Sequence, residues 1–375
     1  MRLAFCLFKY FPFGGLQRDF LRIARVCRER GHVVDVYAMA WEDEVPADLN
    51  LHLLKVSALT NHGRARAFAR KLSERLAVEN YAAVVGFNKL PELDLYFAAD
   101  PCFAARAGQR GPLYRLNGRY RTYAALEKAV FAVGSETEIL LISNVEKDHF
   151  IRHYQTPERR FHFLPPGISR DRTIPENSEE IRRDFRRAHG FDDDEVLLLM
   201  VGSGYQTKGL DRSIRALAAL PEALRGKARL LVVGKGKGAP FLRLARQLGV
   251  ADRVHLYGGR DDVPAFLLGA DLLLQPSYYE NTGTAIVEAL AAGLPVLATA
   301  NCGYAHYVED ADAGKLVPMP FAQSSMNDLL RDMLTSAERP RWRDKALVFA
   351  ARADLYSLPE RAAEIIEAVA ARRNA

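Results

Sequence analysis

The 375-residue chain is predicted to be an α/β protein of two Rossmann-like domains facing each other across a cleft. Three observations predict this: its length, its alternating strand and helix patterns, and a break in the pattern near the middle. A chain of this length exceeds the size at which one hydrophobic core keeps growing. Hydrophobic residues make up 49% and charged residues 26%, which is typical of a folded protein. Alternation of strands and helices predicts parallel sheets covered on both faces.

The first half of the chain alternates apolar runs with amphipathic segments. Residues 3–8 form a continuous apolar run, typical of a strand buried on both faces. A glycine loop at residues 13–15 follows. Apolar residues at helical spacing then predict a helix over residues 16–30, ended by Gly31. Further strands are predicted at residues 33–38, 83–87, 96–99 and 138–143.

A second alternating series begins after the sequence Leu-Pro-Pro-Gly at residues 164–167 and a polar stretch. We expect the first domain to cover residues 1–166 and the second residues 167–355. The last segment predicts a helix, within residues 356–375, that returns to the first domain. Strands of the second domain are predicted at residues 196–201, 229–233, 254–257, 272–274 and 295–299.

The net charge and the cysteine content limit the cellular compartments and the binding partners to be expected. The formal net charge of +6 favours anionic partners without identifying one. The four cysteines are isolated, with no metal-ligand spacing, so neither a disulfide nor a zinc site is expected, which suits a reducing cytoplasm. No window approaches about 18 uncharged apolar residues, so we expect no membrane-spanning helix.

Glu280 and Glu288, eight positions apart, are the most informative pair in the chain. If Glu280 ends a loop and Glu288 lies on the next helix, a rise of about 1.5 Å per residue separates them by roughly 12 Å. This matches the hexose and ribose ends of a nucleotide-sugar. The N–H groups of the helix N-terminus would face the diphosphate between them. From the spacing alone, two surface glutamates on an amphipathic helix is the simpler interpretation.

Two further loops follow predicted strands, where ligands bind in open parallel sheets. The first runs from Gly202 to Gly209 and contains Lys208, whose charge suits a phosphate. The second contains Arg260, followed by Asp262 in a position to cap a helix. Each cation taken alone is more simply a solvated surface charge. Their occurrence in three successive strand-end loops, the third with the glutamate pair, favours a binding site.

These motifs, Gly-x-Gly…Lys-Gly at 202–209, Gly-Arg-x-x-Val at 259–263 and Glu-x7-Glu at 280–288, resemble the donor half of the retaining GT-B glycosyltransferases of family 4. Other strings narrow the resemblance to the lipopolysaccharide core glucosyltransferases, which add the first hexose of the outer core to an inner-core heptose. The similarity runs from residue 1 to about residue 370. The strings lie at residues 8–20, 86–89, 98–100, 164–168 and 302–307.

The resemblance implies a donor site in the second domain and an acceptor site in the first. Glu280 would bind a hexose hydroxyl, Glu288 the ribose, and Lys208 the diphosphate with Arg260 and Arg172. Such cations replace a divalent metal, so no metal is expected, and the Asp-x-Asp strings at 192–194 and 310–312 lack the setting of a metal motif. The implied donor-site residues are Gly14, Gly15, Arg172, Gly202, Lys208, Arg260, Val263, Glu280, Asn281, Thr282, Gly283, Thr284 and Glu288.

The implied catalytic residues are Asp19, Asp100, Lys208 and Glu280. Retention of configuration can proceed through a carboxylate nucleophile or through front-face departure and attack. Asp19 and Asp100 follow first-domain strands, and either could orient or deprotonate the acceptor hydroxyl. An exposed helix residue and a helix cap are the simpler interpretations of these two aspartates. We favour front-face chemistry, with Lys208 and Arg260 stabilising departing UDP.

The resemblance implies transfer of a hexose from a UDP-sugar to a heptose, forming an α-1,3 link in outer-core biosynthesis. UDP-glucose is the default donor. UDP-N-acetylgalactosamine is the alternative, because Asn281, Thr282 and Thr284 stand where glucose-using relatives carry small apolar residues. Added hydrogen-bonding groups can select an axial hydroxyl or an N-acetyl substituent.

The acceptor is expected to be anionic, because inner-core heptoses carry phosphate. First-domain cations that could meet it are Lys9, Arg18, His62, Arg64 and Lys89. Residues 102–131 form a basic, aromatic segment in which Glu127 is the one acidic residue. This composition predicts a peripheral contact with the anionic cytoplasmic face of the inner membrane. A solvated charged helix is the simpler interpretation, and no nucleic-acid recognition motif is present.

Three other functional classes share parts of this pattern. A nicotinamide dehydrogenase would need Gly-x-Gly-x-x-Gly after the first strand, whereas residues 14–19 read Gly-Gly-Leu-Gln-Arg-Asp. A UDP-sugar epimerase would share the two-domain fold but needs no acceptor, which leaves the basic aromatic segment without a role. A non-catalytic nucleotide-sugar binding protein is distinguished by the absence of turnover.

Overall fold

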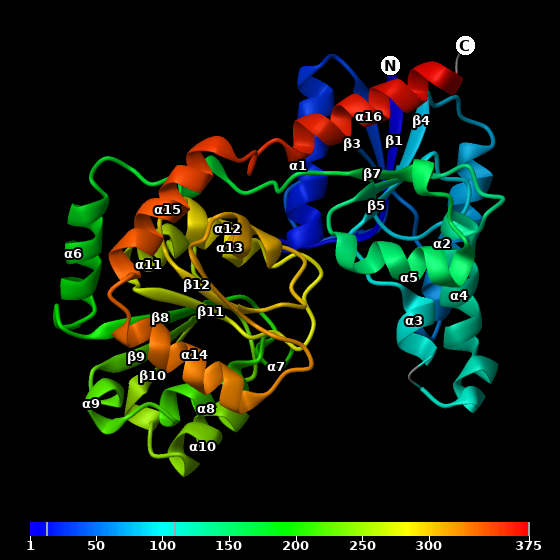
Figure 1. Cartoon of the computed structure of the whole chain (residues 1–375). Helices are drawn as coiled ribbons and strands as arrows, with labels where there is room; N and C mark the ends of the chain where they lie inside the picture. Colours follow the sequence, from blue (N-terminus) through cyan, green and yellow to red (C-terminus); the bar gives the residue numbers. More distant parts are fainter. Residues whose placement is uncertain (13, 109, 374–375) are drawn as a thin grey trace. The chain divides into compact units, whose positions relative to one another are not determined.

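The computed structural model describes residues 1–12, 14–108 and 110–373. The chain divides into two compact units (Figure 1). One consists of Met1–Gly167 together with Ser357–Ala375, and the other of Ile168–Tyr356. Each unit contains one sheet in which every strand pairing is parallel, as the alternating pattern predicts.

The sheet of the first unit has seven strands in the order β3-β2-β1-β4-β5-β6-β7. The central strand β1 pairs with β2 on one side and with β4 on the other, so Leu3 lies opposite both Val34 and Ala83. All three of these residues are fully buried. The strands are β1 (Arg2–Tyr10), β2 (Val33–Trp41), β3 (Asn50–Leu53), β4 (Ala83–Gly86), β5 (Leu95–Ala98), β6 (Glu138–Leu141) and β7 (Phe161–Phe163).

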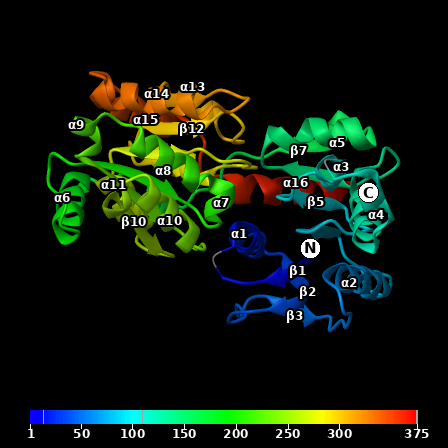
Figure 2. The same cartoon turned by 90° about the horizontal axis from the view of Figure 1, so that it is seen from below.

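Helices cover both faces of this sheet. On one face, α1 and α16 share a core, and α16 contributes Ala362, Ile366 and Val369 to it. Helix α16 lies beside α1 although the two stand at opposite ends of the chain (Figures 1 and 2). The other face packs against α2, α4 and α5. The helices are α1 (Gly15–Glu29), α2 (Asn61–Leu76), α3 (Phe103–Gly108), α4 (Gly118–Phe131), α5 (Lys147–Tyr154) and α16 (Leu358–Arg373).

The sheet of the second unit has six strands in the order β10-β9-β8-β11-β12-β13. One face packs mainly against α6, α11, α12 and α13, the other mainly against α8, α10 and α14. The strands are β8 (Val196–Val201), β9 (Ala228–Val233), β10 (Val254–Gly258), β11 (Leu272–Gln275), β12 (Val296–Thr299) and β13 (Gly314–Val317). The helices are α6 (Ser178–Ala188), α7 (Tyr205–Lys208), α8 (Leu210–Ala218), α9 (Glu222–Arg225), α10 (Ala239–Gln247), α11 (Val263–Gly269), α12 (Thr284–Ala291), α13 (His306–Asp310), α14 (Gln323–Thr335) and α15 (Arg339–Arg352).

Both sheets reverse their strand order at one place, between β1 and β4 and between β8 and β11. Connections on the two sides of such a point run to opposite faces of the sheet and leave a crevice at the carboxyl ends of the strands. The loops that follow β1, β4, β8 and β11 are therefore the ones in which functional side chains are expected.

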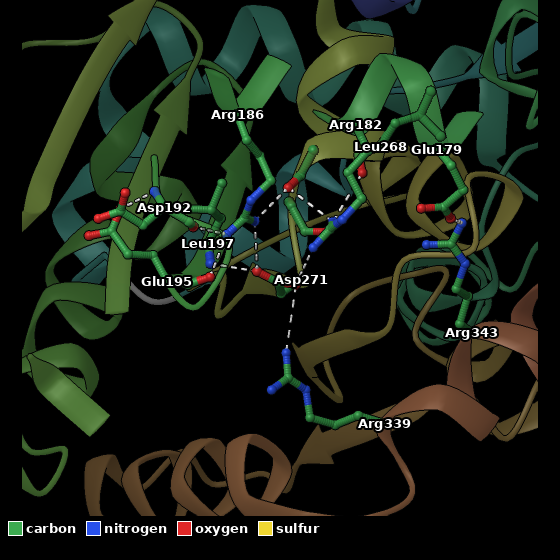
Figure 3. A network of polar contacts seen from close by, with 12 residues as sticks. Glu179, Arg182, Arg186, Asp192, Glu195, Leu197, Leu268, Asp271, Arg339 and Arg343 are labelled. Carbon is green, nitrogen blue, oxygen red and sulfur yellow. Dashed lines mark hydrogen bonds and ion pairs between the residues drawn. The ribbon is translucent and has the colours of Figure 1, made fainter. Parts of the chain in front are cut away.

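At the amino ends of the strands of the second sheet, Asp271 is the centre of a polar network (Figure 3). This residue directly precedes β11. Its carboxylate accepts hydrogen bonds from Arg182 at 2.7 Å and from the backbone N–H of Leu197 at 2.8 Å. Arg186 and Arg339 approach the same carboxylate at 3.4 and 3.7 Å. This network fixes α6 and α15 to the sheet at its amino edge, away from the strand-end loops.

The cysteines and the helices can be compared with the expectations on disulfides and on membrane spans. All four cysteines are buried and free, as their isolated positions predict. Within the part of the chain that the structure describes, none of the helices combines the length and the apolar character that crossing a bilayer requires.

Candidate active site

Lys208 and Glu280 form an ion pair at the carboxyl edge of the second sheet. Lys208 is the last residue of α7, after β8, and Glu280 lies in the loop between β11 and α12. The ammonium contacts Oε2 of Glu280, and the amide of Gln275 donates to the same oxygen at 3.2 Å. Both charged side chains are mostly buried, with 21% and 11% exposed. Two residues that came from separate sequence motifs thus meet at the point where the strand order reverses.

The ion pair forms because the backbone after β8 and the backbone after β11 lie close together. Gly209 follows Lys208 with φ of +75°, and a Cβ there would lie 2.1 Å from the carbonyl oxygen of Pro276. A glycine is therefore required for the two loops to touch. The N–H of Tyr278 donates to the carbonyl oxygen of Thr207 at 2.9 Å. Gly202, predicted to border the phosphate site, has φ of +147°, and a Cβ there would contact the Lys208 side chain.

The segment after Glu280 is held by the loop that follows β12. Glu280 and Cys302 form an isolated parallel bridge, and the N–H of Tyr304 donates to the carbonyl oxygen of Thr282 at 2.7 Å. Gly283, with φ of +90°, is the N-cap of α12 and provides no capping side chain. The side chains of the predicted donor-site residues Asn281, Thr282 and Thr284 are half-buried.

Glu288 lies on α12, as the Glu-x7-Glu interpretation requires, and is only 6% exposed. The Nε of Arg172 lies 3.4 Å from its Oε1. Arg172 was predicted beside the diphosphate with Lys208, and the structure gives it Glu288 as an ion-pair partner. The guanidinium therefore places a positive charge directly beside the buried carboxylate.

Arg260 lies in the loop after β10 and forms a two-point ion pair with Asp262, with contacts of 2.8 and 2.6 Å. This pairing raises the pKa of Arg260 and lowers that of Asp262. Asp262 stands at the N-cap position of α11, but its side chain makes no capping hydrogen bond, because Arg260 occupies both of its oxygens. The half-buried Val263 begins α11.

In the first unit, the loop after β1 leads into α1 through Gly14 and Gly15. A Cβ on Gly14 would lie 1.9 Å from Oε1 of Gln17, which is buried and donates to the Lys9 carbonyl oxygen at 3.0 Å. A Cβ on Gly15 would meet no atom within 4 Å. Local packing thus explains why residue 14 is a glycine, but it does not explain the glycine at position 15. Residue 13, also part of the predicted loop, lies outside the described residues.

Asp19 is on α1, with 14% of its side chain exposed and Arg18 at 3.7 Å. Burial raises the pKa of Asp19 to about 6, although Arg18 and Arg22 act to lower it. A carboxylate with this pKa is suited to exchange a proton near neutral pH.

Asp100 follows β5 and is exposed at the rim of a hollow of about 280 Å³. Phe103 and Arg106 also line this hollow. A second hollow, of about 370 Å³, adjoins it through the shared walls Phe8 and Tyr123 and is lined by Lys9 and Arg64. The two hollows lie where the carboxyl ends of β1, β2 and β5 meet and combine aromatic surface with charged groups.

Lys89, predicted as an acceptor-binding cation, is a buried residue with several partners of its own. Only 9% of it is exposed, and its ammonium pairs with Glu127 and donates to the Pro101 carbonyl oxygen at 2.6 Å. Glu127 is fully buried and also accepts from the N–H of Ala104 at 2.9 Å and from the Tyr154 hydroxyl at 2.7 Å. These contacts give Lys89 a structural role, and the residue also lines the hollow at whose rim Asp100 lies.

The other predicted acceptor cations have partners of their own. Lys9 forms an ion pair with Glu42, and Arg64 donates to the Ala58 carbonyl oxygen at 3.2 Å. His62 lies 3.3 Å from the Thr60 hydroxyl. Of the predicted acceptor cations, Lys9 and Arg64 line a hollow together.

The Asp-x-Asp strings lie at surface positions. Asp194 pairs with Lys227 at 2.8 Å, and Asp312 pairs with Lys345. Among residues 1–12, 14–108 and 110–373, no group of three or more histidine, cysteine, aspartate or glutamate side chains is arranged to hold a metal ion.

Three supporting residues of this site were not predicted from the sequence. Gln275 and Ser277 are fully buried, and the Gln275 amide bonds both Ser277 at 3.1 Å and Glu280. Arg212 donates to the carbonyl oxygens of Pro276 and Ser277 at 3.1 Å each. Gln275 and Ser277 could have been found in the sequence, because they are polar residues directly after the predicted strand 272–274, and positions at strand ends often carry binding groups.

Comparison with known proteins agrees with this geometry. Residues 13–172 match the family model Glycosyltransferase Family 4, and residues 181–347 match Glycosyl transferases group 1. The lipopolysaccharide glucosyltransferase WaaG of Escherichia coli (strain K12) is 48% identical over 368 residues, which is 98% of each chain.

Solved structures give the same answer. A crystal structure of WaaG, a glycosyltransferase involved in lipopolysaccharide biosynthesis, has a TM-score of 0.90, with 97% of this chain and 99% of that chain covered. HepE of Anabaena in complex with UDP-glucose has a TM-score of 0.75 at 18% identity, with 98% and 100% covered, and shares the fold. The chain is therefore a GT-B glycosyltransferase that belongs to family 4, in the family of the lipopolysaccharide glucosyltransferase WaaG.

Proposed function

We propose that the protein is a retaining hexosyltransferase that moves glucose from UDP-glucose to an inner-core heptose of lipopolysaccharide, forming an α-1,3 link. One observation carries this proposal: the Lys208–Glu280 pair stands at the strand-order reversal of the second sheet, followed on α12 by Glu288. The identity of 48% to an enzyme named lipopolysaccharide glucosyltransferase supports the choice of donor and acceptor.

In this proposal each group at the edge of the second sheet has a separate task. Glu280 binds a hexose hydroxyl, and Glu288, oriented by Arg172, binds the ribose. The Lys208 ammonium stabilises the charge that develops on the departing UDP, the kind of interaction that contributes most to many enzymatic rates. Arg260 contributes less, because its side chain is 42% exposed, against 21% for Lys208, and its charge is more strongly screened by water. Attack from the front face then gives retention without a covalent intermediate.

UDP-N-acetylgalactosamine is a second candidate donor, favoured by one observation. The polar side chains of Asn281, Thr282 and Thr284 are half-buried in the loop that carries Glu280. A site that hydrogen-bonds a substituent discriminates strongly against sugars without it. Replacement of Asn281 and Thr284 by alanine should then reduce turnover of the N-acetyl donor more than that of UDP-glucose.

For the acceptor we propose the pair of hollows at the edge of the first sheet. Asp100 at the rim of one hollow orients the heptose hydroxyl, with Tyr123 and Phe103 as stacking surfaces, while Lys9 and Arg64 in the other meet an anionic group of the acceptor. Asp19, with its pKa near 6, is the second candidate base. Substitution of Asp100 and Asp19 by asparagine, one at a time, distinguishes the two.

We also propose that residues 102–131 contact the cytoplasmic face of the inner membrane. The one acidic residue of this segment, Glu127, is fully buried, so its exposed charges are all positive. Leu113 and Leu116, 78% and 66% exposed, give the same segment an apolar tip. Flotation with anionic vesicles should show binding that weakens with added salt. The absence of binding at low salt would contradict the proposal.

The test of the proposed function is UDP release from UDP-glucose, UDP-N-acetylgalactosamine and UDP-galactose, with and without heptose-terminated lipopolysaccharide and with EDTA present. We expect release with one donor only, dependent on the acceptor and insensitive to EDTA. A UDP-sugar epimerase would instead isomerise the donor and release no UDP. Loss of transfer on addition of EDTA would contradict the metal-free part of the proposal.

A further inference from the structure

Arg212, on the first turn of α8, is surrounded by the loops at the carboxyl edge of the second sheet. It is 8% exposed, and its guanidinium donates to the carbonyl oxygens of Pro276 and Ser277 at 3.1 Å each. Its central carbon lies 3.6 Å from the ring centroid of Tyr278 and 3.7 Å from that of Phe321. The guanidinium therefore has an aromatic ring as a close neighbour in each of two loops and two carbonyl groups to bind.

These contacts connect the loops after three strands. Arg212 follows β8, residues 276–278 follow β11, and Phe321 follows β13. Gln323 donates to the Arg212 carbonyl oxygen at 3.1 Å, and the Tyr278 hydroxyl donates to Asp211 at 2.8 Å. The loop after β12 joins the same cluster, because Asn301 donates to the Tyr278 carbonyl oxygen at 3.0 Å. Four strand-end loops are thus tied together at one side chain and its neighbour Tyr278.

We propose that Arg212 is a positioning residue for sugar transfer. This inference rests on the proposed function, in which Lys208 and Glu280 hold the donor. Arg212 is four residues from Lys208, and the carbonyl groups that it binds are three and four residues from Glu280. By fixing residues 276–278 against the start of α8, it sets the separation of the Lys208 ammonium and the Glu280 carboxylate without touching the donor.

The shape of the guanidinium explains why arginine is needed. One terminal nitrogen of the planar guanidinium, Nη1, donates to both carbonyl oxygens, and the plane presents flat faces to the rings of Tyr278 and Phe321. A lysine ammonium is a point charge on a flexible stem and has no such faces. Arg212→Lys keeps the charge but loses the contacts with both rings and the fixed direction of the N–H donors toward the two carbonyl oxygens. Small displacements of catalytic groups reduce turnover strongly, since a shift of about 1 Å lowers rates by about a hundredfold.

The first experiment compares Arg212→Lys with Arg225→Lys in acceptor-dependent UDP release and in UDP binding by calorimetry. Arg225 is a matched control, because it also donates to two carbonyl groups of this unit, those of Ala218 and Leu220, at 3.3 and 3.4 Å. We expect kcat of Arg212→Lys to fall by about 10- to 100-fold. UDP affinity should change less than kcat, because Glu288 and Arg172, at the proposed ribose end of the donor, lie outside the Arg212 contacts. Arg225→Lys should keep the wild-type kcat.

A second variant, Phe321→Leu, removes one aromatic neighbour and leaves the arginine in place. Its kcat should lie between those of wild type and Arg212→Lys, and amide exchange of residues 276–283 should be faster in both variants. A wild-type kcat for Arg212→Lys, with only a lowered melting temperature, overturns the inference in favour of a purely structural role. Absence of transfer by the wild-type protein, with UDP binding intact, would instead contradict the proposed function.

Discussion

The Lys208 ammonium and the Glu280 carboxylate neutralise each other at the edge of the second sheet. In the proposed function, a nucleotide-sugar whose diphosphate lies beside Lys208 would draw the ammonium away from Glu280 and leave that carboxylate to accept a hexose hydroxyl. The two residues of this pair would then bind the two groups that the scissile bond joins, Lys208 the diphosphate and Glu280 the hexose. UDP alone, which lacks the hexose, would then compete with Glu280 for Lys208 and gain nothing from the carboxylate.

Neutralising the two partners should therefore have opposite effects on UDP binding. In Glu280→Gln, Lys208 loses its competitor, so the Kd of UDP should fall, while kcat drops by about a hundredfold with the loss of hexose positioning. In Lys208→Met, the Kd of UDP should rise and kcat should drop as well. Calorimetry with UDP and acceptor-dependent UDP release measure both. Weaker UDP binding in both variants would show that Glu280 does not restrain Lys208.

If Asp19 is the base, transfer should depend on pH through its raised pKa. The carboxylate form is required, so kcat/KM should fall as the pH drops through about 6. In Asp100→Asn this inflection should persist, whereas Asp19→Asn should lose both the inflection and most of the activity. An unchanged pH profile in Asp19→Asn removes Asp19 from the proton transfer.

The same shift makes a prediction for stability. The pKa of Asp19 is raised from 3.8 to about 6, so the folded state binds more protons than the unfolded state between these values. Ionised Asp19 therefore lowers stability fully above about pH 6 and not at all below about pH 4. Asp19→Asn should stabilise the protein by about 1–3 kcal/mol near pH 8. Thermal melting at both ends of this range checks the sign, and the gain should vanish at the acidic end.

Gly14 and Gly15 should respond differently to alanine. A Cβ at Gly14 displaces Gln17, so Gly14→Ala should lower the melting temperature. A Cβ at Gly15 meets open space within its own unit, so Gly15→Ala should fold normally. If the bare backbone at Gly15 faces the donor phosphate, kcat/KM of this variant should fall by about tenfold or more. Normal kinetics in a normally folded Gly15→Ala would show that the donor does not approach there.

Substitutions of Lys89 and Lys9 should distinguish a residue that stabilises the fold from one that binds the acceptor. Lys89→Met leaves the Glu127 carboxylate buried without its cation and should destabilise the first unit by about 3 kcal/mol or more. Lys9→Ala removes an exposed ion pair, which contributes little to stability. We expect its melting temperature to stay unchanged while the KM for an anionic acceptor rises. Thermal denaturation and acceptor titration of the two variants provide the comparison.

Most of the fold was predictable because the central strands are buried on both faces. All ten predicted strands are present, from the apolar run that became β1 to the one that became β12. The strands that were missed, β3, β7 and β13, are edge strands in which every residue but Val317 is half-buried or exposed. Such strands lack a continuous apolar run, so hydrophobic patterning alone does not find them.

The candidate site was predictable where a short motif carries the chemistry. Lys208 and Glu280 stood out as strand-end residues, and the structure brings them together. The burial of Lys89 could not be predicted, because its partner Glu127 is 38 residues away. The bond of Arg260 to Asp262 was missed for a different reason. At a separation of two residues the aspartate serves equally well as a helix cap or as an arginine partner, and only the three-dimensional geometry decides.

Helix α16 closes the core of the first unit with the last residues of the chain. During synthesis, the sheet of that unit emerges first, but the face that α1 covers only in part stays incomplete until α16 has been made. The second unit, encoded wholly in between, can complete its own core earlier. The order of maturation is therefore inverted relative to the usual N-terminal-first sequence. A chain truncated before α16 would expose the apolar surface of the first sheet and of α1 that this helix covers, and chaperones and proteases would act on it.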